Sequence, residues 1–83
     1  MQIRYFAWVR QRTGISTEEL TPPEGVRTIA DMIAWLKTRG PEFEAAFENE
    51  RIIRAALDQT HVAHDADITG AREVAFFPPV TGG

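Results

Sequence analysis

The sequence ends on two glycines, Gly82 and Gly83, and a terminal glycine carboxylate is the group in this chain best suited to chemistry. Glycine has no Cβ, so a diglycine end can enter a narrow channel and bring its carboxyl carbon against ATP, a nucleophile or a bound substrate. A carboxylate is a poor acyl donor because its oxygen is a bad leaving group. The sequence therefore predicts that the Gly83 carboxylate is activated, with adenylation supplying the leaving group.

Two prolines precede this end and predict a stiff approach to it. Pro78 and Pro79 each fix φ and bias the preceding residue toward extended geometry. Five extended residues from Pro79 to Gly83 reach about 16 Å, enough to cross into the interior of another protein. The residues predicted to lie in a partner's active site are Pro78, Pro79, Val80, Thr81 and Gly82. The alternative is a frayed terminus without a function.

The rest of the chain offers no independent active site. It contains no cysteine, which excludes a disulfide, a thiolate nucleophile and a Cys-ligated metal. His61 and His64 make a poor metal pair without cysteines or an acid cluster, so we predict no metal site and interpret both as solvated turn residues. Glycine-rich phosphate loops and a serine beside a positioned histidine are also missing. No cofactor is expected on the isolated chain.

Composition limits the class of protein and its partners. With 83 residues, 43% of them hydrophobic and 25% charged, the chain is the size of one globular domain. The net charge of −3 comes from interspersed acids and arginines, and no basic stripe indicates nucleic acid or an anionic membrane. The start lacks a signal-peptide pattern, and no apolar run is long enough to cross a bilayer. We expect a cytoplasmic protein whose partners are proteins.

Periodicity predicts a helix among short strands. An alternating strand begins at Ile3, a helical turn over 9–13 is stopped by Gly14, and a second strand covers 16–20. Thr28 and Asp31 are spaced as a capping box for a helix from Ile29 to Arg39. A shorter helical segment lies near Phe43 and Phe47. Further strands are expected over 52–57, 60–63 and 74–77, with a turn at Asp58-Gln59.

This order of elements predicts an α+β domain of the β-grasp, or ubiquitin-like, class. The expected sheet is mixed, with about four to five strands and one main helix packed on one face. The first and last strands lie side by side in its centre. Residues 1–77 form the predicted β-grasp domain, and residues 78–83 form an extended C-terminal diglycine tail.

At its end the chain closely resembles the MoaD-type sulfur carriers, the small subunits of molybdopterin synthase. Their tails carry Glu-Val-Ala-Phe-Phe-Pro-Pro-Val-x-Gly-Gly, which is matched here from Glu73 to Gly83. The likeness extends more loosely to the opening strand and to Leu57-Asp58-Gln59-Thr60. It departs at Arg72, where such families usually carry an acid.

The resemblance implies a pathway for Gly83. An ATP-using MoeB-type adenylating enzyme would form a Gly83 acyl-adenylate, and a sulfur donor protein would convert it to a thiocarboxylate. Docked into the MoaE-type large subunit, in an expected heterotetramer, the thiocarboxylate would give sulfur to cyclic pyranopterin monophosphate and build the dithiolene of molybdopterin. The chain is then not catalytic alone, because the active site belongs to the large subunit.

Two aromatics are candidates for docking. Phe6 and Phe77 fall on the strand phase opposite the candidate core residues Tyr5 and Phe76, so they should point away from the helix-covered face. Exposed aromatics on a bare sheet favour contact with a partner, and the resemblance points to the same face. The alternative is that Phe6 and Phe77 pack on each other across neighbouring strands.

Other functions stay open from the sequence alone. The same tail chemistry serves sulfur carriers for thiamine or tRNA thiolation, and ubiquitin-like modifiers that join Gly83 to lysines. A β-grasp interaction module with an inert terminus is the alternative of a different class. The Pro-Pro-Val string before the diglycine favours molybdopterin synthase.

Overall fold

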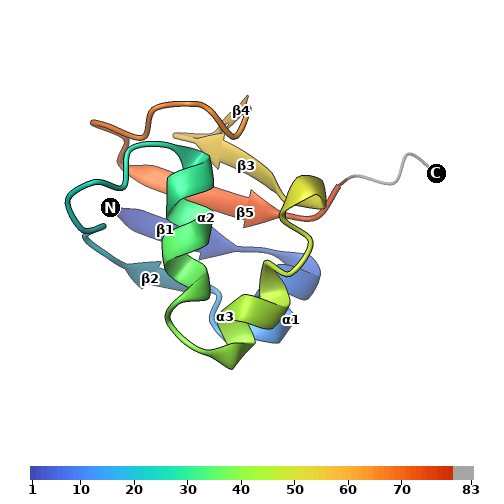
Figure 1. The fold of residues 1–83 in the computed structure, drawn as a ribbon. Helices are drawn as coiled ribbons and strands as arrows, with labels where there is room; N and C mark the ends of the chain where they lie inside the picture. Colours follow the sequence, from blue (N-terminus) through green and yellow to red (C-terminus); the bar gives the residue numbers. More distant parts are fainter. Residues whose placement is uncertain (80–83) are drawn as a thin grey trace.

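The chain folds around one mixed sheet of five strands (Figure 1). The structure, a computed structural model, describes residues 1–79. The strand order is β2-β1-β5-β3-β4, in which β1 runs parallel to β5 and the other neighbours are antiparallel. The strands are β1 (Gln2–Tyr5), β2 (Thr17–Glu19), β3 (Arg54–Leu57), β4 (Thr60–Val62) and β5 (Glu73–Phe77).

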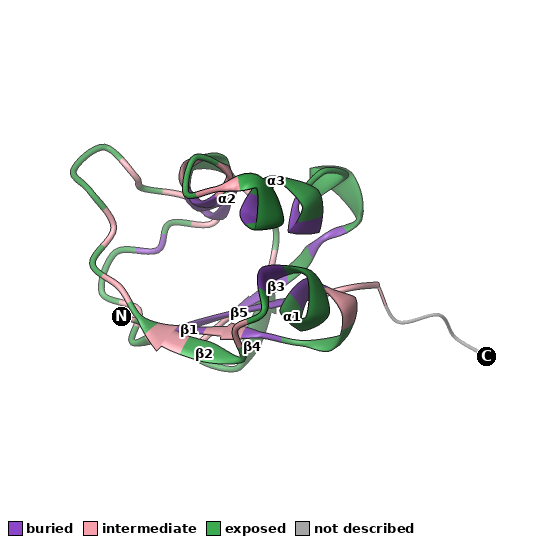
Figure 2. Cartoon of the chain, turned by 90° about the horizontal axis from the view of Figure 1, so that it is seen from below, coloured by how far each residue is buried: buried purple, intermediate pink, exposed green. Residues whose placement is uncertain are grey.

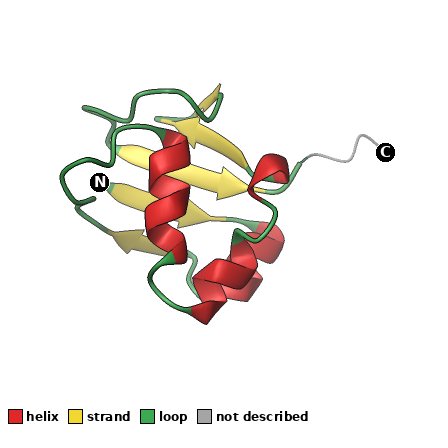
Figure 3. Ribbon diagram, viewed as in Figure 1, coloured by secondary structure: helices red, strands yellow, loops and turns green. Residues whose placement is uncertain are grey.

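Helices α2 and α3 cover one face of this sheet, and the opposite face is left open by the described part of the chain (Figure 2). The helices are α1 (Ala7–Thr13), α2 (Ile29–Lys37) and α3 (Pro41–Ala46), and a 3₁₀ turn covers Glu50–Ile52. Helices α1 and α3 pack together at the end of the sheet where β1 stops, while α2 crosses its middle (Figure 3). The predicted α+β arrangement with one main helix on a mixed sheet is confirmed. Within residues 1–79, no helix is long and apolar enough to span a membrane.

The capping box predicted for the main helix is present. The Thr28 hydroxyl accepts the Asp31 N–H at 3.1 Å, and the Asp31 carboxylate accepts the Thr28 N–H at 3.2 Å. The buried stripe of α2 consists of Ile29, Met32, Ile33 and Leu36, as the spacing predicts. The helix ends at Lys37, two residues before the predicted end at Arg39. The N–H groups of Thr38 and Arg39 instead bond to carbonyls three residues back, which tightens the last turn.

The opening strand is shorter than its alternating pattern. β1 ends at Tyr5, and Phe6 becomes the N-cap of α1 because its carbonyl accepts the N–H groups of Val9 and Arg10. Ala7 takes a φ of 51°, which turns the chain sharply out of the sheet. The helix then stops at Gly14 in the left-handed conformation, as the sequence predicts.

The β3–β4 hairpin turns at Asp58 and Gln59, as predicted. Both residues have positive φ, 48° and 71°, the geometry that matches the twist of a two-residue hairpin. The Asp58 carboxylate accepts the N–H groups of Arg72 and Glu73 at 2.9 and 3.0 Å. This turn therefore also fixes the start of β5.

Buried aromatic rings hold β1 and β5 to α3. Tyr5 stacks on Phe76 with ring centroids 6.3 Å apart, and Phe47 meets Phe76 edge-on at 5.2 Å. The Tyr5 hydroxyl donates to Glu18 on β2 at 2.8 Å, and Arg39 binds both oxygens of the same carboxylate at 2.8 and 3.0 Å. Tyr5 is thus fully buried with its one polar atom satisfied.

This network shifts the pKa values of its members. Burial, followed by the hydrogen bond to Glu18, raises the pKa of Tyr5 far above its ordinary value. Burial acts to raise the pKa of Glu18 as well, but the bonds from Arg39 and Tyr5 act more strongly together and lower it overall. The carboxylate stays ionised at neutral pH and ties β2 to the end of α2.

Candidate functional site

The site begins where β5 leaves the sheet. β5 is the middle strand, paired with β1 on one side and β3 on the other, and it ends at Phe77. Pro78 and Pro79 follow, both half-buried. The other residues predicted to act in the tail, Val80, Thr81, Gly82 and Gly83, lie outside the described residues. The division into residues 1–77 and 78–83 stays a prediction, although β5 ends at the proposed boundary.

Two small side chains, Ala75 and Ala56, lie on the open face of the sheet beside this exit. Arg4, Ala75 and Ala56 are neighbours across β1, β5 and β3. Ala56 and Ala75 are only 6% and 8% exposed although no helix of the described chain covers them. The open face therefore has an apolar centre at these alanines, and longer side chains such as Arg4 surround it.

Phe6 and Phe77 both lie away from the buried cluster. Phe6 is 37% exposed, and the Arg4 guanidinium lies 5.2 Å from its ring centroid. Phe77 is half-buried, and its ring lies 5.0 Å from the imidazole of His61. The neighbours Tyr5 and Phe76 are 1% and 0% exposed, so each pair of adjacent aromatics divides between the two sides of the sheet. A docking role for Phe6 and Phe77 stays a prediction.

His61 is not a turn residue, so this part of the interpretation is wrong, whereas His64 lies in a turn as interpreted. His61 lies in β4 opposite Ala56, with its ring against Phe77 on the open face. His64 is half-buried, and its Nε2 lies 2.7 Å from the Ile53 carbonyl, which places a hydrogen bond across the point where β3 and β4 diverge. Alternation after the Asp58-Gln59 turn was the available signal for His61, since Thr60 and Val62 flank it on the opposite face.

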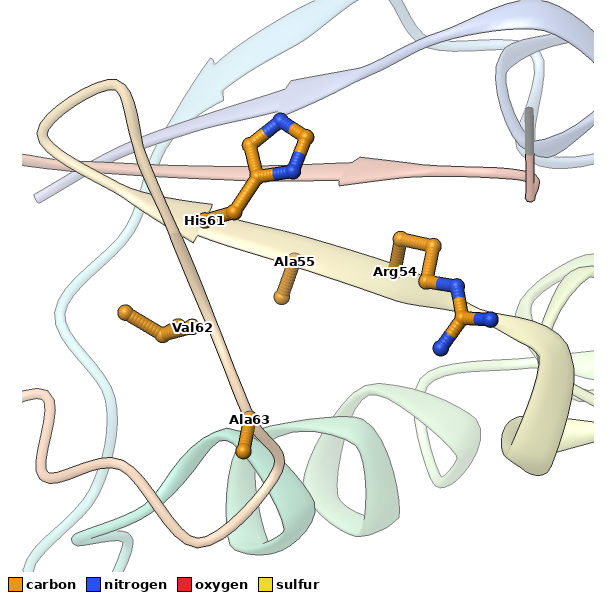
Figure 4. Close-up of a pocket in the computed structure, with 5 residues that line it drawn as sticks. All are labelled: Arg54, Ala55, His61, Val62 and Ala63. Atoms are coloured by element: carbon orange, nitrogen blue, oxygen red, sulfur yellow. The ribbon is translucent and has the colours of Figure 1, made fainter.

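A shallow hollow of about 350 Å³ opens at the edge of the sheet close to these residues (Figure 4). Its lining comes from β3, β4 and the residue after β4: Arg54, Ala55, His61, Val62 and Ala63. Arg54 is exposed and lies opposite Phe77 in the β3–β5 register. Sequence reasoning missed Arg54, because the apolar run that marks the strand drew attention to its buried neighbours.

This arrangement supports binding and offers little for catalysis. Among residues 1–79, no three His, Cys, Asp or Glu side chains gather to hold a metal ion. The hollow contains two basic side chains and no carboxylate to act beside them as a base. The described face can hold another protein surface.

Comparisons with known proteins cover nearly the whole chain. A family model described as the ThiS family matches residues 3–83. A protein of Escherichia coli named molybdopterin synthase sulfur carrier subunit is 32% identical over 83 residues, which is 100% of this chain and 99% of the relative. The protein of the same name from Haemophilus influenzae is 28% identical over 83 residues, with the same shares covered.

Solved structures agree on the fold. A molybdopterin converting factor subunit 1 from Pyrococcus furiosus superposes with a TM-score of 0.72 at 28% identity, covering 95% of each chain. The small archaeal modifier protein 1 of Haloferax volcanii superposes with a TM-score of 0.73 over 95% of each chain. At 23% identity this second likeness shows the fold alone. The predicted β-grasp fold is confirmed.

Proposed function

The chain belongs to the ThiS family, and on that premise we propose that it is the sulfur carrier subunit of a molybdopterin synthase. The observation that carries the proposal is the full-length match, through the terminal diglycine, to relatives that bear this name. The residue that carries sulfur is Gly83. The domain before it positions the tail and presents a surface to the proteins that act on it.

The first step activates the Gly83 carboxylate. In the active site of a MoeB-type adenylating enzyme, a carboxylate oxygen attacks the α-phosphorus of ATP, and pyrophosphate leaves. A persulfide on the sulfur donor protein then attacks the acyl carbon and displaces AMP. Cleavage of the new S–S bond by a thiol releases the thiocarboxylate, so ATP is a substrate of the partner and no cofactor resides on this chain.

The second step delivers the sulfur. The tail enters the MoaE-type large subunit, where the anionic thiocarboxylate sulfur is the nucleophile toward cyclic pyranopterin monophosphate. The large subunit supplies the cations for the phosphate and the acid-base groups, since Pro78, Pro79, Val80, Thr81 and Gly82 offer little beyond backbone amides and one hydroxyl. We place the complex in the cytoplasm as a heterotetramer of two small and two large subunits.

The fold suits this task because it separates the anchor from the reacting end. The tail continues from the middle strand, which is paired on both sides and holds the buried Phe76. Pairing on both sides restrains the base of the tail, which favours a reproducible approach of the reacting end. The open face next to the exit, with Phe6 and Phe77, supplies the docking surface.

Intact-mass measurement tests the proposal. The full chain, incubated with ATP, a MoeB-type enzyme and a persulfide donor, should gain the mass difference between sulfur and oxygen, localised by fragmentation to Gly83. Omission of ATP is the control. A chain without Gly83 should gain nothing, and the same mass gain in that shortened chain would refute Gly83 as the carrier.

A further inference from the structure

The charges on the open face are unevenly paired close to the tail. Arg4 binds Glu73 at 3.3 Å, so that pair is internally compensated. Arg54 forms no ion pair with any of residues 1–79, and its side chain is exposed. Ala55, its neighbour in β3, is 2% exposed and points into the core, so Arg54 points to the open side of the sheet.

Arg54 lies at the base of the tail. It is the Cα partner of Phe77, the last residue of β5, one residue before Pro78. His61 also lines this hollow (Figure 4). Its ring centroid lies 5.0 Å from that of Phe77. A protein that surrounds the tail therefore meets Arg54 and His61 as soon as it covers Phe77.

The hollow is locally cationic on a chain whose net charge is −3. None of its five lining residues is acidic. An adjoining hollow of about 250 Å³ shares Arg54, Val62 and Ala63 and adds Arg51 and His64, again without an acid. Glu50 and Asp58, each four residues from Arg54, are engaged elsewhere: Glu50 lies 3.8 Å from Lys37, and the Asp58 carboxylate accepts the N–H groups of Arg72 and Glu73. No acid of residues 1–79 forms an ion pair with Arg54, so an anionic group on a partner can complement this edge.

Resting on the proposed function, we propose that Arg54, which lines the same hollow as His61, pairs with a carboxylate side chain of the large subunit that receives the tail. A guanidinium binds a carboxylate through two parallel hydrogen bonds. The hollow is open and shallow and does not enclose a small ion, which favours a side chain carried in on a docking surface over a free phosphate.

The ion pair between Arg54 and the partner's carboxylate makes docking selective among partner proteins. A partner with a carboxylate at that position gains a charge-assisted hydrogen bond, and this bond is strengthened because docking excludes water from the site. A partner without one buries the Arg54 guanidinium uncompensated and loses affinity. Apolar contact with Phe77 alone cannot discriminate in this way, because any apolar surface satisfies it.

The test compares two neutralised arginines in the full chain. Arg54→Gln and Arg27→Gln each remove one exposed charge, but Arg27 precedes α2 on the helix side of the domain. Binding to the large subunit is measured by calorimetry at several salt concentrations. Arg54→Gln should raise Kd at least about tenfold and flatten its salt dependence, whereas Arg27→Gln should change Kd less than about twofold. Arg54→Lys keeps the charge and loses the paired geometry, so its Kd should fall between these values.

Each other outcome overturns the inference in a recognisable way. Equal Kd values for Arg54→Gln and Arg27→Gln, with both variants folded, would remove Arg54 from the interface. A second outcome concerns inorganic phosphate, added at millimolar concentration and constant ionic strength. If it abolishes binding of the wild-type chain to the large subunit but leaves the binding of Arg54→Gln the same as without phosphate, the hollow is a free-anion site instead. If the wild-type chain fails to bind the large subunit at all, the proposed function fails together with this inference. Normal wild-type binding with an indifferent Arg54 refutes the inference alone.

Discussion

Phe76 and Phe77 are adjacent in the chain but lie on opposite faces of β5, so truncating each to alanine should separate folding from docking. Phe76 is fully buried and packs against the rings of Tyr5 and Phe47. Phe77 is half-buried, and its described aromatic neighbour is His61 on the open face. The two variants remove the same atoms, which makes each the matched control of the other.

The expected costs differ by several-fold. Phe76→Ala opens a cavity under the sheet and should lower the free energy of unfolding by about 3–5 kcal/mol. A domain of this size has a total stability of roughly 4–12 kcal/mol, so this variant is close to its limit and Phe76→Leu serves as the milder version. Phe77→Ala forfeits a ring contact worth about 1 kcal/mol in the free domain. In the complex it should cost about 2 kcal/mol or more, or about 30-fold in Kd.

Urea unfolding and calorimetric binding to the large subunit measure the two effects on the same samples. Phe77→Ala should keep a near wild-type unfolding midpoint and bind weakly, while Phe76→Leu should unfold earlier and still bind when folded. A Phe77→Ala variant that unfolds as early as Phe76→Leu and binds normally would show that Phe77 belongs to the core. The docking face assigned above would then be wrong.

Two further outcomes are expected. Gly82→Ala should leave the melting temperature unchanged and impair adenylation or sulfur transfer, because a Cβ would crowd the reacting carbon; full activity in a coupled molybdopterin assay would contradict this steric argument. Glu18→Gln should lower stability by about 1–3 kcal/mol at neutral pH, since Arg39 and Tyr5 lose a charged acceptor. The pKa of Glu18 is lower in the folded state, so its contribution is present above the ordinary value of 4.5 and is lost as pH falls through the folded pKa. Unfolding curves from pH 7 to pH 3 should therefore converge for the two proteins, and a constant gap would contradict the network.

Local signals in the sequence predicted the elements whose stability is also local. The Thr28–Asp31 capping box needs only four consecutive residues, and the left-handed stop at Gly14 needs only one. The end of β1 was harder to predict, because alternation continues in the sequence past Tyr5. The chain leaves the sheet there through the positive φ of Ala7, which no residue preference indicates.

The candidate site divides in the same way. Alternation was enough to place Phe77 opposite Phe76, but it could not show that His61 meets the Phe77 ring, because that contact depends on how β3 registers with both β4 and β5. The roles of Arg54 and His64 likewise follow from where β3 and β4 diverge. The Glu18 bridge from Tyr5 to Arg39 joins residues 13 and 21 positions apart, beyond the reach of any local pattern.

The pairing of β5 on both sides has a mechanical consequence. A pull on the tail along β5 acts across the hydrogen bonds that join this strand to β1 and β3, which are perpendicular to the strand on the β3 side and slanted on the β1 side. These bonds are loaded together in shear, and none can be peeled away first. A force along this axis is thus spread over two ladders, so β5 should resist being pulled out of the sheet better than a strand paired on one side only.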